Sequence, residues 1–122
     1  MAQAPEHFVT LSKAQKERLA EAVQVLKNPG ERRMAQQWST AKQVAEWLCR
    51  PIALRTLHKQ HPDIDRVFLG MGNKDDLDLV SNRLLRGKGE ARSGGEWKTF
   101  TFTCELDPHR GDVSNFAERF DS

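Results

Sequence analysis

The stretch that decides the fold is residues 97–106, Trp-Lys-Thr-Phe-Thr-Phe-Thr-Cys-Glu-Leu. Its apolar and polar side chains alternate strictly, and a period of two is typical of a β-strand with one buried face. The expected inward face is Phe100, Phe102, Cys104 and Leu106. The expected outward face is Trp97, Thr99, Thr101 and Thr103. We therefore predict an antiparallel strand whose phenylalanine side needs a covering layer.

The segments on either side of this strand predict its neighbours. Residues 93–95 (Ser-Gly-Gly) and 107–111 (Asp-Pro-His-Arg-Gly) are rich in turn-forming residues. Residues 89–92 and 113–120 are then expected to be flanking strands, which gives a three-stranded meander.

The middle of the chain is more ambiguous. Residues 66–69 are a short apolar run that fits either a strand or a helical turn. Residues 70–76 have the composition of a loop, and the pattern of residues 77–85 slightly favours a strand.

The front half of the chain has helical periodicity. Ser12 and Gln15 have the spacing of a capping box, which predicts a helix over residues 13–27 that ends at Asn-Pro-Gly, residues 28–30. Its apolar stripe is Leu19, Val23 and Leu26. A second amphipathic stripe predicts a helix over residues 31–49. That stripe is Met34, Trp38, Ala41, Ala45 and Leu48, which places Trp38 in the helical core.

Pro51 suits the first turn of a third, short helix that ends at His61-Pro62-Asp63. The expected fold class is α+β, with an N-terminal helical hairpin plus this short helix packed on a small C-terminal antiparallel sheet. Residues 1–10 are expected to form a flexible N-terminal arm, and residues 11–122 a single domain.

Composition excludes several classes of protein. The 122 residues carry a net charge of +2, and 30% are charged, which fits one soluble domain and does not require a nucleic-acid partner. There is no nucleophile elbow, P-loop, zincin or dinucleotide fingerprint, so we expect no enzyme, cofactor or metal site. His58 and His61, followed by Asp63 and Asp65, are better explained as a solvated helix end than as a metal site.

The two cysteines, Cys49 and Cys104, allow one disulfide, and two free thiols fit equally well at this point. The N-terminal residues contain no signal peptide. A mature exported chain, periplasmic or secreted, and a cytoplasmic protein are therefore both open.

A combination of motifs suggests a family. Residues 82–92, Asn-Arg-Leu-Leu-Arg-Gly-Lys-Gly-Glu-Ala-Arg, are followed by the spacing Trp97-x-x-Phe100-x-Phe102-x-Cys104 and by Val113-x-x-Phe116. This resembles small alphaproteobacterial cell-envelope proteins of an uncharacterised family, in which an earlier cysteine heads a short helix, as Cys49 does before Pro51. The resemblance implies export and a disulfide, and it supplies no activity or cofactor. Because Cys49 ends a core-facing helix and Cys104 lies on a core-facing strand, we predict that the two are bonded.

The basic segment is the strongest candidate for a binding site. Its cations are Arg83, Arg86, Lys88 and Arg92, diluted only by Glu90. A charged edge strand that prevents aggregation would explain them as well. The tight turn at residues 93–95 should bring this segment beside Trp97, Thr99 and Thr101. We expect one shared surface for an anionic or saccharide-like partner.

The leading hypothesis is a non-catalytic binding or accessory protein of the bacterial envelope, whose partner is an anionic glycan or another envelope protein. One alternative is a cytoplasmic nucleic-acid-binding module that uses residues 83–92. Another is a small enzyme with an unrecognised site. Arg110-Gly111-Asp112 spells an adhesion tripeptide, although these are also ordinary turn residues.

Overall fold

A computed structural model describes residues 9–72 and 76–121 of the chain. Most of the predicted arm, residues 1–8, and part of the predicted loop, residues 73–75, lie outside the described residues.

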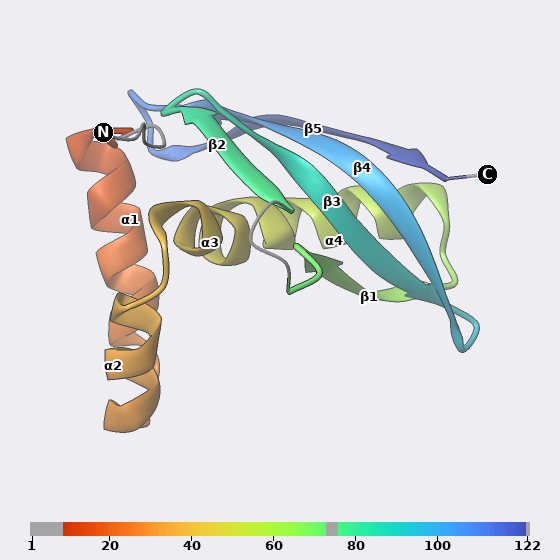
Figure 1. Ribbon diagram of the computed structural model, residues 1–122, viewed down its shortest axis with the longest axis horizontal. Helices are drawn as coiled ribbons and strands as arrows, with labels where there is room; N and C mark the ends of the chain where they lie inside the picture. Colours follow the sequence, from red (N-terminus) through yellow and green to blue (C-terminus); the bar gives the residue numbers. More distant parts are fainter. Residues whose placement is uncertain (1–8, 73–75, 122) are drawn as a thin grey trace, which may run out of the picture.

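The fold is α+β, as predicted, with a helical N-terminal part and a curled antiparallel sheet (Figure 1). The helices are α1 (Lys13–Gln24), α2 (Pro29–Gln36), α3 (Thr40–Val44), the π-helical segment η1 (Ala45–Cys49) and α4 (Arg50–Gln60). The strands are β1 (Ile64–Leu69), β2 (Leu77–Ser81), β3 (Leu84–Ser93), β4 (Glu96–Asp107) and β5 (Asp112–Phe120).

The sheet is built around β3, β4 and β5, which form the predicted antiparallel meander. Both β1 and β2 pair with the other side of β3: β2 pairs along residues 84–87 and β1 along residues 89–93. The two short strands therefore lie end to end along one edge of β3. The ambiguous run at residues 66–69 is part of a strand, and residues 77–85 form β2, a turn and the start of β3.

Two glycines of β3 allow the chain to pass from β1 to β2. The Gly70 N–H donates to the Lys88 carbonyl (2.7 Å), and the Lys88 N–H donates to the Asp76 carbonyl (2.9 Å). A Cβ on Gly87 would lie 2.1 Å from the Asp76 oxygen, and one on Gly89 would lie 2.6 Å from the Phe68 oxygen. Only residues without side chains fit beside backbone at these distances.

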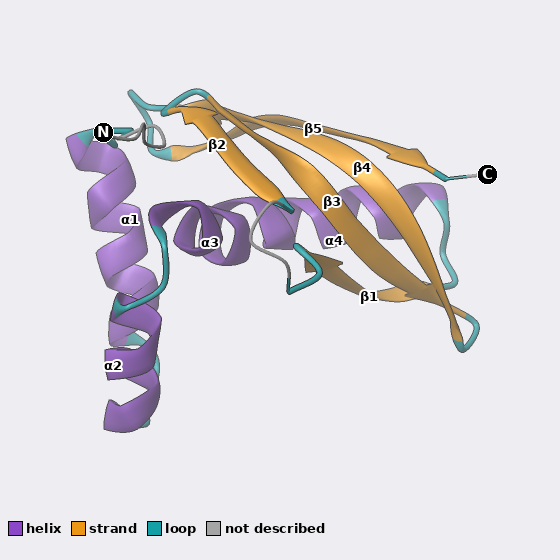
Figure 2. Cartoon of the chain, viewed as in Figure 1, coloured by secondary structure: helices purple, strands orange, loops and turns teal. Residues whose placement is uncertain are grey.

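The long helical run α3–η1–α4 covers one face of the sheet (Figure 2). Its buried residues pack against the inward side chains of β4, in the phase predicted from the alternation. The core includes Val44, Leu48, Ala53, Leu57, Phe100, Phe102 and Leu106. The predicted disulfide is also present: Cys49 on η1 is bonded to Cys104 on β4, with a Cα separation of 6.2 Å.

The predicted helix over residues 31–49 is wrong in its boundaries, because the chain leaves the helix after α2. Ser39 starts a new helix, and its side chain accepts a hydrogen bond from the Lys42 N–H. Pro51 lies in the first turn of α4, as predicted, but α4 follows η1 without a break. In η1 the Arg50 N–H donates to the Ala45 carbonyl, five residues back, so the helix continues through the proline, which has no N–H to donate.

The second apolar stripe is only partly buried as a result of this break. Met34 is 63% exposed, although the stripe predicted it to face the core. Trp38 is half-buried at the break, where it stacks on Trp47 with ring centroids 5.1 Å apart. In the described part of the chain, no helix is both long and apolar enough to cross a membrane.

Candidate functional site

The pairing register of β3 and β4 places the basic segment beside the threonine face. Directly opposite residues of an antiparallel pair share a face. Arg92 lies opposite Trp97, and Lys88 lies opposite Thr101. Arg86 lies opposite Thr103. We call this outward surface the outer face. Arg83 is not part of it, because it lies in the turn between β2 and β3.

Trp97 is 44% exposed on the outer face and is supported from one side. Its ring stacks on that of Phe68 from β1, with centroids 5.7 Å apart and planes 23° apart. The guanidinium carbon of Arg92 lies 5.9 Å from the Trp97 centroid, and that of Arg50 lies 4.9 Å from the Phe68 centroid. We call Trp97 and Phe68 the aromatic platform.

Two of the predicted binding cations are held by carboxylates. Arg92 donates two hydrogen bonds to Asp65 of β1, at 2.9 and 2.8 Å. The hydrogen bond from Arg92 lowers the pKa of the Asp65 carboxyl below its usual value. Arg86 donates to Asp78 of β2 at 3.1 Å. These two arginines are therefore less available to an anion than the sequence alone suggested.

A different set of cations remains accessible. Thr101 lies between Lys88 on β3 and Arg119 on β5, because both residues are its register partners. No salt bridge is recorded for Lys88 or Arg119 among residues 9–72 and 76–121. We call Lys88, Thr101 and Arg119 the cationic row. It lines an open hollow of about 570 Å³ on the outer face. The other lining residues are Asp78, Arg86, Gly87, Phe102, Thr103, Ala117 and Glu118.

Between the platform and the cationic row the sign of the charge reverses. Glu90 lies opposite Thr99, and the Thr99 hydroxyl donates to the Asp121 carboxylate at 2.5 Å. We call Glu90, Thr99 and Asp121 the acidic row. From the sequence, Glu90 was expected only to dilute the positive charge, and Arg119 was not among the predicted binding residues. The signal for Arg119 was the alternation of residues 113–120, which places it on the same face as Ala117.

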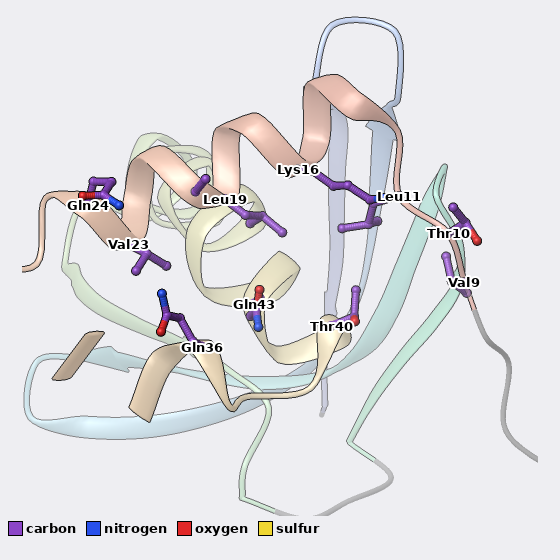
Figure 3. A pocket seen from close by; sticks show the side chains of 11 residues that line it. Val9, Thr10, Leu11, Lys16, Leu19, Val23, Gln24, Gln36, Thr40 and Gln43 are labelled. Atoms are coloured by element: carbon purple, nitrogen blue, oxygen red, sulfur yellow. The ribbon is translucent and has the colours of Figure 1, made fainter. Parts of the chain in front are cut away.

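Two further hollows are lined by residues of the described ranges. The first lies away from the outer face, and the second borders it, because Trp97, Thr99 and Asp121 are among its lining residues. One, of about 530 Å³, separates α1 from α2 and α3, and Figure 3 shows Leu19 and Val23 of α1 facing Gln36 and Gln43 across it. Its described lining residues are apolar or carry amide and hydroxyl groups, with Lys16 as the one charged residue among them. The other, also about 530 Å³, lies where α4 ends, beside Phe120 and Lys98.

Near that second hollow, Glu118 of β5 pairs with Phe102 and so shares the inward face of the sheet. Partial burial raises the pKa of the Glu118 carboxyl above its ordinary value, and the nearby His61 opposes this shift. The His61 ring packs edge-on against Phe120, with centroids 5.7 Å apart.

The remaining sequence candidates have structural partners. Nδ1 of His58 lies 2.8 Å from the Ile64 carbonyl. No cluster of three or more His, Cys, Asp or Glu side chains is placed to hold a metal ion within the described ranges. In the adhesion tripeptide, Arg110 forms a salt bridge with Asp112 at 3.0 Å, and a Cβ on Gly111 would lie 2.7 Å from the Ala14 oxygen of α1. The salt bridge therefore lies within the β4–β5 turn, and Gly111 allows this turn to approach α1 closely.

The chain matches no protein-family model, no curated protein and no solved structure.

Proposed function

We propose that this protein is a non-catalytic binding or accessory protein of the bacterial envelope, and that its outer face binds an anionic saccharide. The observation that carries the proposal is the cationic row, in which Lys88 and Arg119 lie on the two strands next to Thr101 and all three residues line one open hollow. Two cations and a hydroxyl on three adjacent strands form a recognition site for a carboxylate or a phosphate.

The aromatic platform supports a saccharide over a simple inorganic anion. Trp97 lies on the same face of β4 as Thr101, and its ring is held flat against Phe68. An exposed, preorganised aromatic ring binds a flat apolar surface without much loss of side-chain freedom. The C–H face of a pyranose ring is such a surface.

The envelope part of the proposal is supported by the disulfide and by the family resemblance. Disulfides persist in oxidising compartments such as the bacterial periplasm and are rare in the cytosol. The bond between Cys49 and Cys104 joins two fully buried residues in the core. We propose a periplasmic or secreted location for the mature chain.

The test is a calorimetric titration with acidic oligosaccharides (polygalacturonate and hyaluronan oligomers) and with single-stranded DNA. We expect saccharide binding that weakens about tenfold in the Lys88→Gln and Arg119→Gln variants, since a hydrogen bond to a charged group contributes about 1.5–3 kcal/mol. Lys27→Gln is the matched control, because Lys27 is exposed in the link between α1 and α2.

Failure of both saccharides to bind would refute the proposal. Tighter binding of single-stranded DNA than of either saccharide, with a steep dependence on salt, would favour a nucleic-acid-binding module instead.

A further inference from the structure

The charges on the outer face change sign in register with the strands. Along β4, the outward residue Trp97 belongs to the aromatic platform, Thr99 lies beside the carboxylates of Glu90 and Asp121, and Thr101 lies between Lys88 and Arg119. We infer that the ligand is a saccharide chain in which charged and uncharged sugars alternate. This inference rests on the proposed function and specifies the ligand of the same face.

The cationic row provides one position for a negative group. Lys88 and Arg119 approach from opposite sides of Thr101, so a carboxylate at this level meets a cation on each side and a hydroxyl beneath it. Arg86 does not extend this position along the strand, because Asp78 neutralises it. The face therefore offers one anion site in this hollow and not a continuous basic track.

The acidic row disfavours a second negative group at the next level. Thr99 is two residues from Thr101 along β4, a distance of about 7 Å. A negative group of the ligand at the level of Thr99 would lie between Glu90 and Asp121, within the Debye length of about 8 Å at physiological ionic strength, so their charges would be only partly screened from it. Glu90 and Asp121 approach Thr99 from the two neighbouring sides. A saccharide with a negative charge on every sugar is therefore repelled at the acidic row.

The level of the aromatic platform again accepts a negative group. Trp97 is four residues from Thr101, so the platform lies about 13 Å along the strand from the anion site. Arg92 is paired with Asp65, but the exposed Arg66 lies opposite Arg92 in the register and adds a second cation at this level. A charged sugar can therefore stack on Trp97, and the uncharged sugar lies between the two charged ones, at the acidic row. A single-stranded nucleic acid lacks this pattern, because it carries a phosphate at every nucleotide.

The experiment compares two probes of equal length. Hyaluronan oligomers alternate a glucuronate with an uncharged N-acetylated sugar, and polygalacturonate oligomers carry a carboxylate on every sugar. We expect the wild-type protein to bind hyaluronan at least tenfold more tightly. Trp97→Ala should weaken hyaluronan binding about tenfold, the lower end of what the loss of one aromatic stacking partner costs.

Glu90→Gln is the decisive variant, because it removes charge from the acidic row without changing the shape of the side chain. It should tighten polygalacturonate binding several-fold and leave hyaluronan binding nearly unchanged. Glu17→Gln on α1 is the matched control, since Glu17 is exposed on a helix outside the sheet. Thermal unfolding of each variant shows that the fold is retained.

The possible failures are distinguishable. If the wild-type protein binds polygalacturonate as tightly as hyaluronan, or if Glu90→Gln leaves the ratio of the two affinities unchanged, the alternating ligand is wrong and the anion-binding function stands. If neither oligomer binds, the proposed function itself fails, and this inference fails with it.

Discussion

Gln15 holds the start of α1 to the sheet. Its side chain is fully buried, and Nε2 donates to the Asn82 carbonyl at 2.7 Å. Oε1 accepts from the Ser12 N–H at 2.9 Å, and the Ser12 hydroxyl accepts in turn from the Gln15 N–H at 3.1 Å. The sequence predicted this capping box from its spacing. It could not show the contact with Asn82, which is 67 positions away and depends on the packing of α1 against the β2–β3 turn.

Replacement of Gln15 by leucine should destabilise the protein by about 1–3 kcal/mol, because it leaves the Asn82 carbonyl and the Ser12 N–H, both at part-buried positions, without these hydrogen-bond partners. The measurement is urea unfolding. Gln24→Leu is the control, since Gln24 is exposed at the end of the same helix and should change stability by less than about 0.5 kcal/mol. An equal effect of the two changes would contradict the role assigned to Gln15.

At the scale of elements, the glycines of β3 decide how β1 and β2 share one edge. Gly89→Ala should destabilise the protein by about 1–3 kcal/mol, as other overpacking changes do. Its new methyl group would lie 2.6 Å from the Phe68 oxygen and 2.8 Å from the Phe100 ring. Lys88→Ala, at the exposed position between Gly87 and Gly89, is the control for thermal unfolding. A Gly89→Ala variant as stable as the wild type would show that the edge has room to adjust.

The elements also differ in how well sequence predicted them. Residues 97–106 alternate because one face of β4 is buried and the other is not, so the pattern alone identified the strand and its phase. The helices over residues 29–60 were harder, because the apolar stripe continues across the break at residues 37–39 and Ser39 resembles any polar residue of a helix. Pro51 correctly predicted the first turn of α4, but the continuity of α4 with η1 was missed, since a π-helical segment has no sequence pattern of its own.

The outer face was predictable from the sequence only in part. Trp97 and the threonines were placed on it by alternation, and the structure confirms this placement. The salt bridges of Arg86 and Arg92 were not predictable, because they depend on the registers of β2 and β1, and no local pattern sets those registers.

At the scale of the whole molecule, the bond between Cys49 and Cys104 joins the helical layer to the sheet. It closes a loop between positions 55 residues apart. In the chain-entropy account, a loop of this length stabilises the folded state by about 4 kcal/mol, because the unfolded chain loses freedom. The double variant Cys49→Ala/Cys104→Ala should therefore lose roughly this much in urea unfolding, together with the cost of two small buried cavities.

The controls use a thiol reductant. Wild-type protein unfolded in its presence should show a similar loss of unfolding free energy, and the double variant should not respond to the reductant. Titration of the denatured, unreduced protein should find no free thiol. Two free thiols, or an unfolding free energy that the reductant leaves unchanged, would show that the bond does not form in solution and would remove one support for the envelope location.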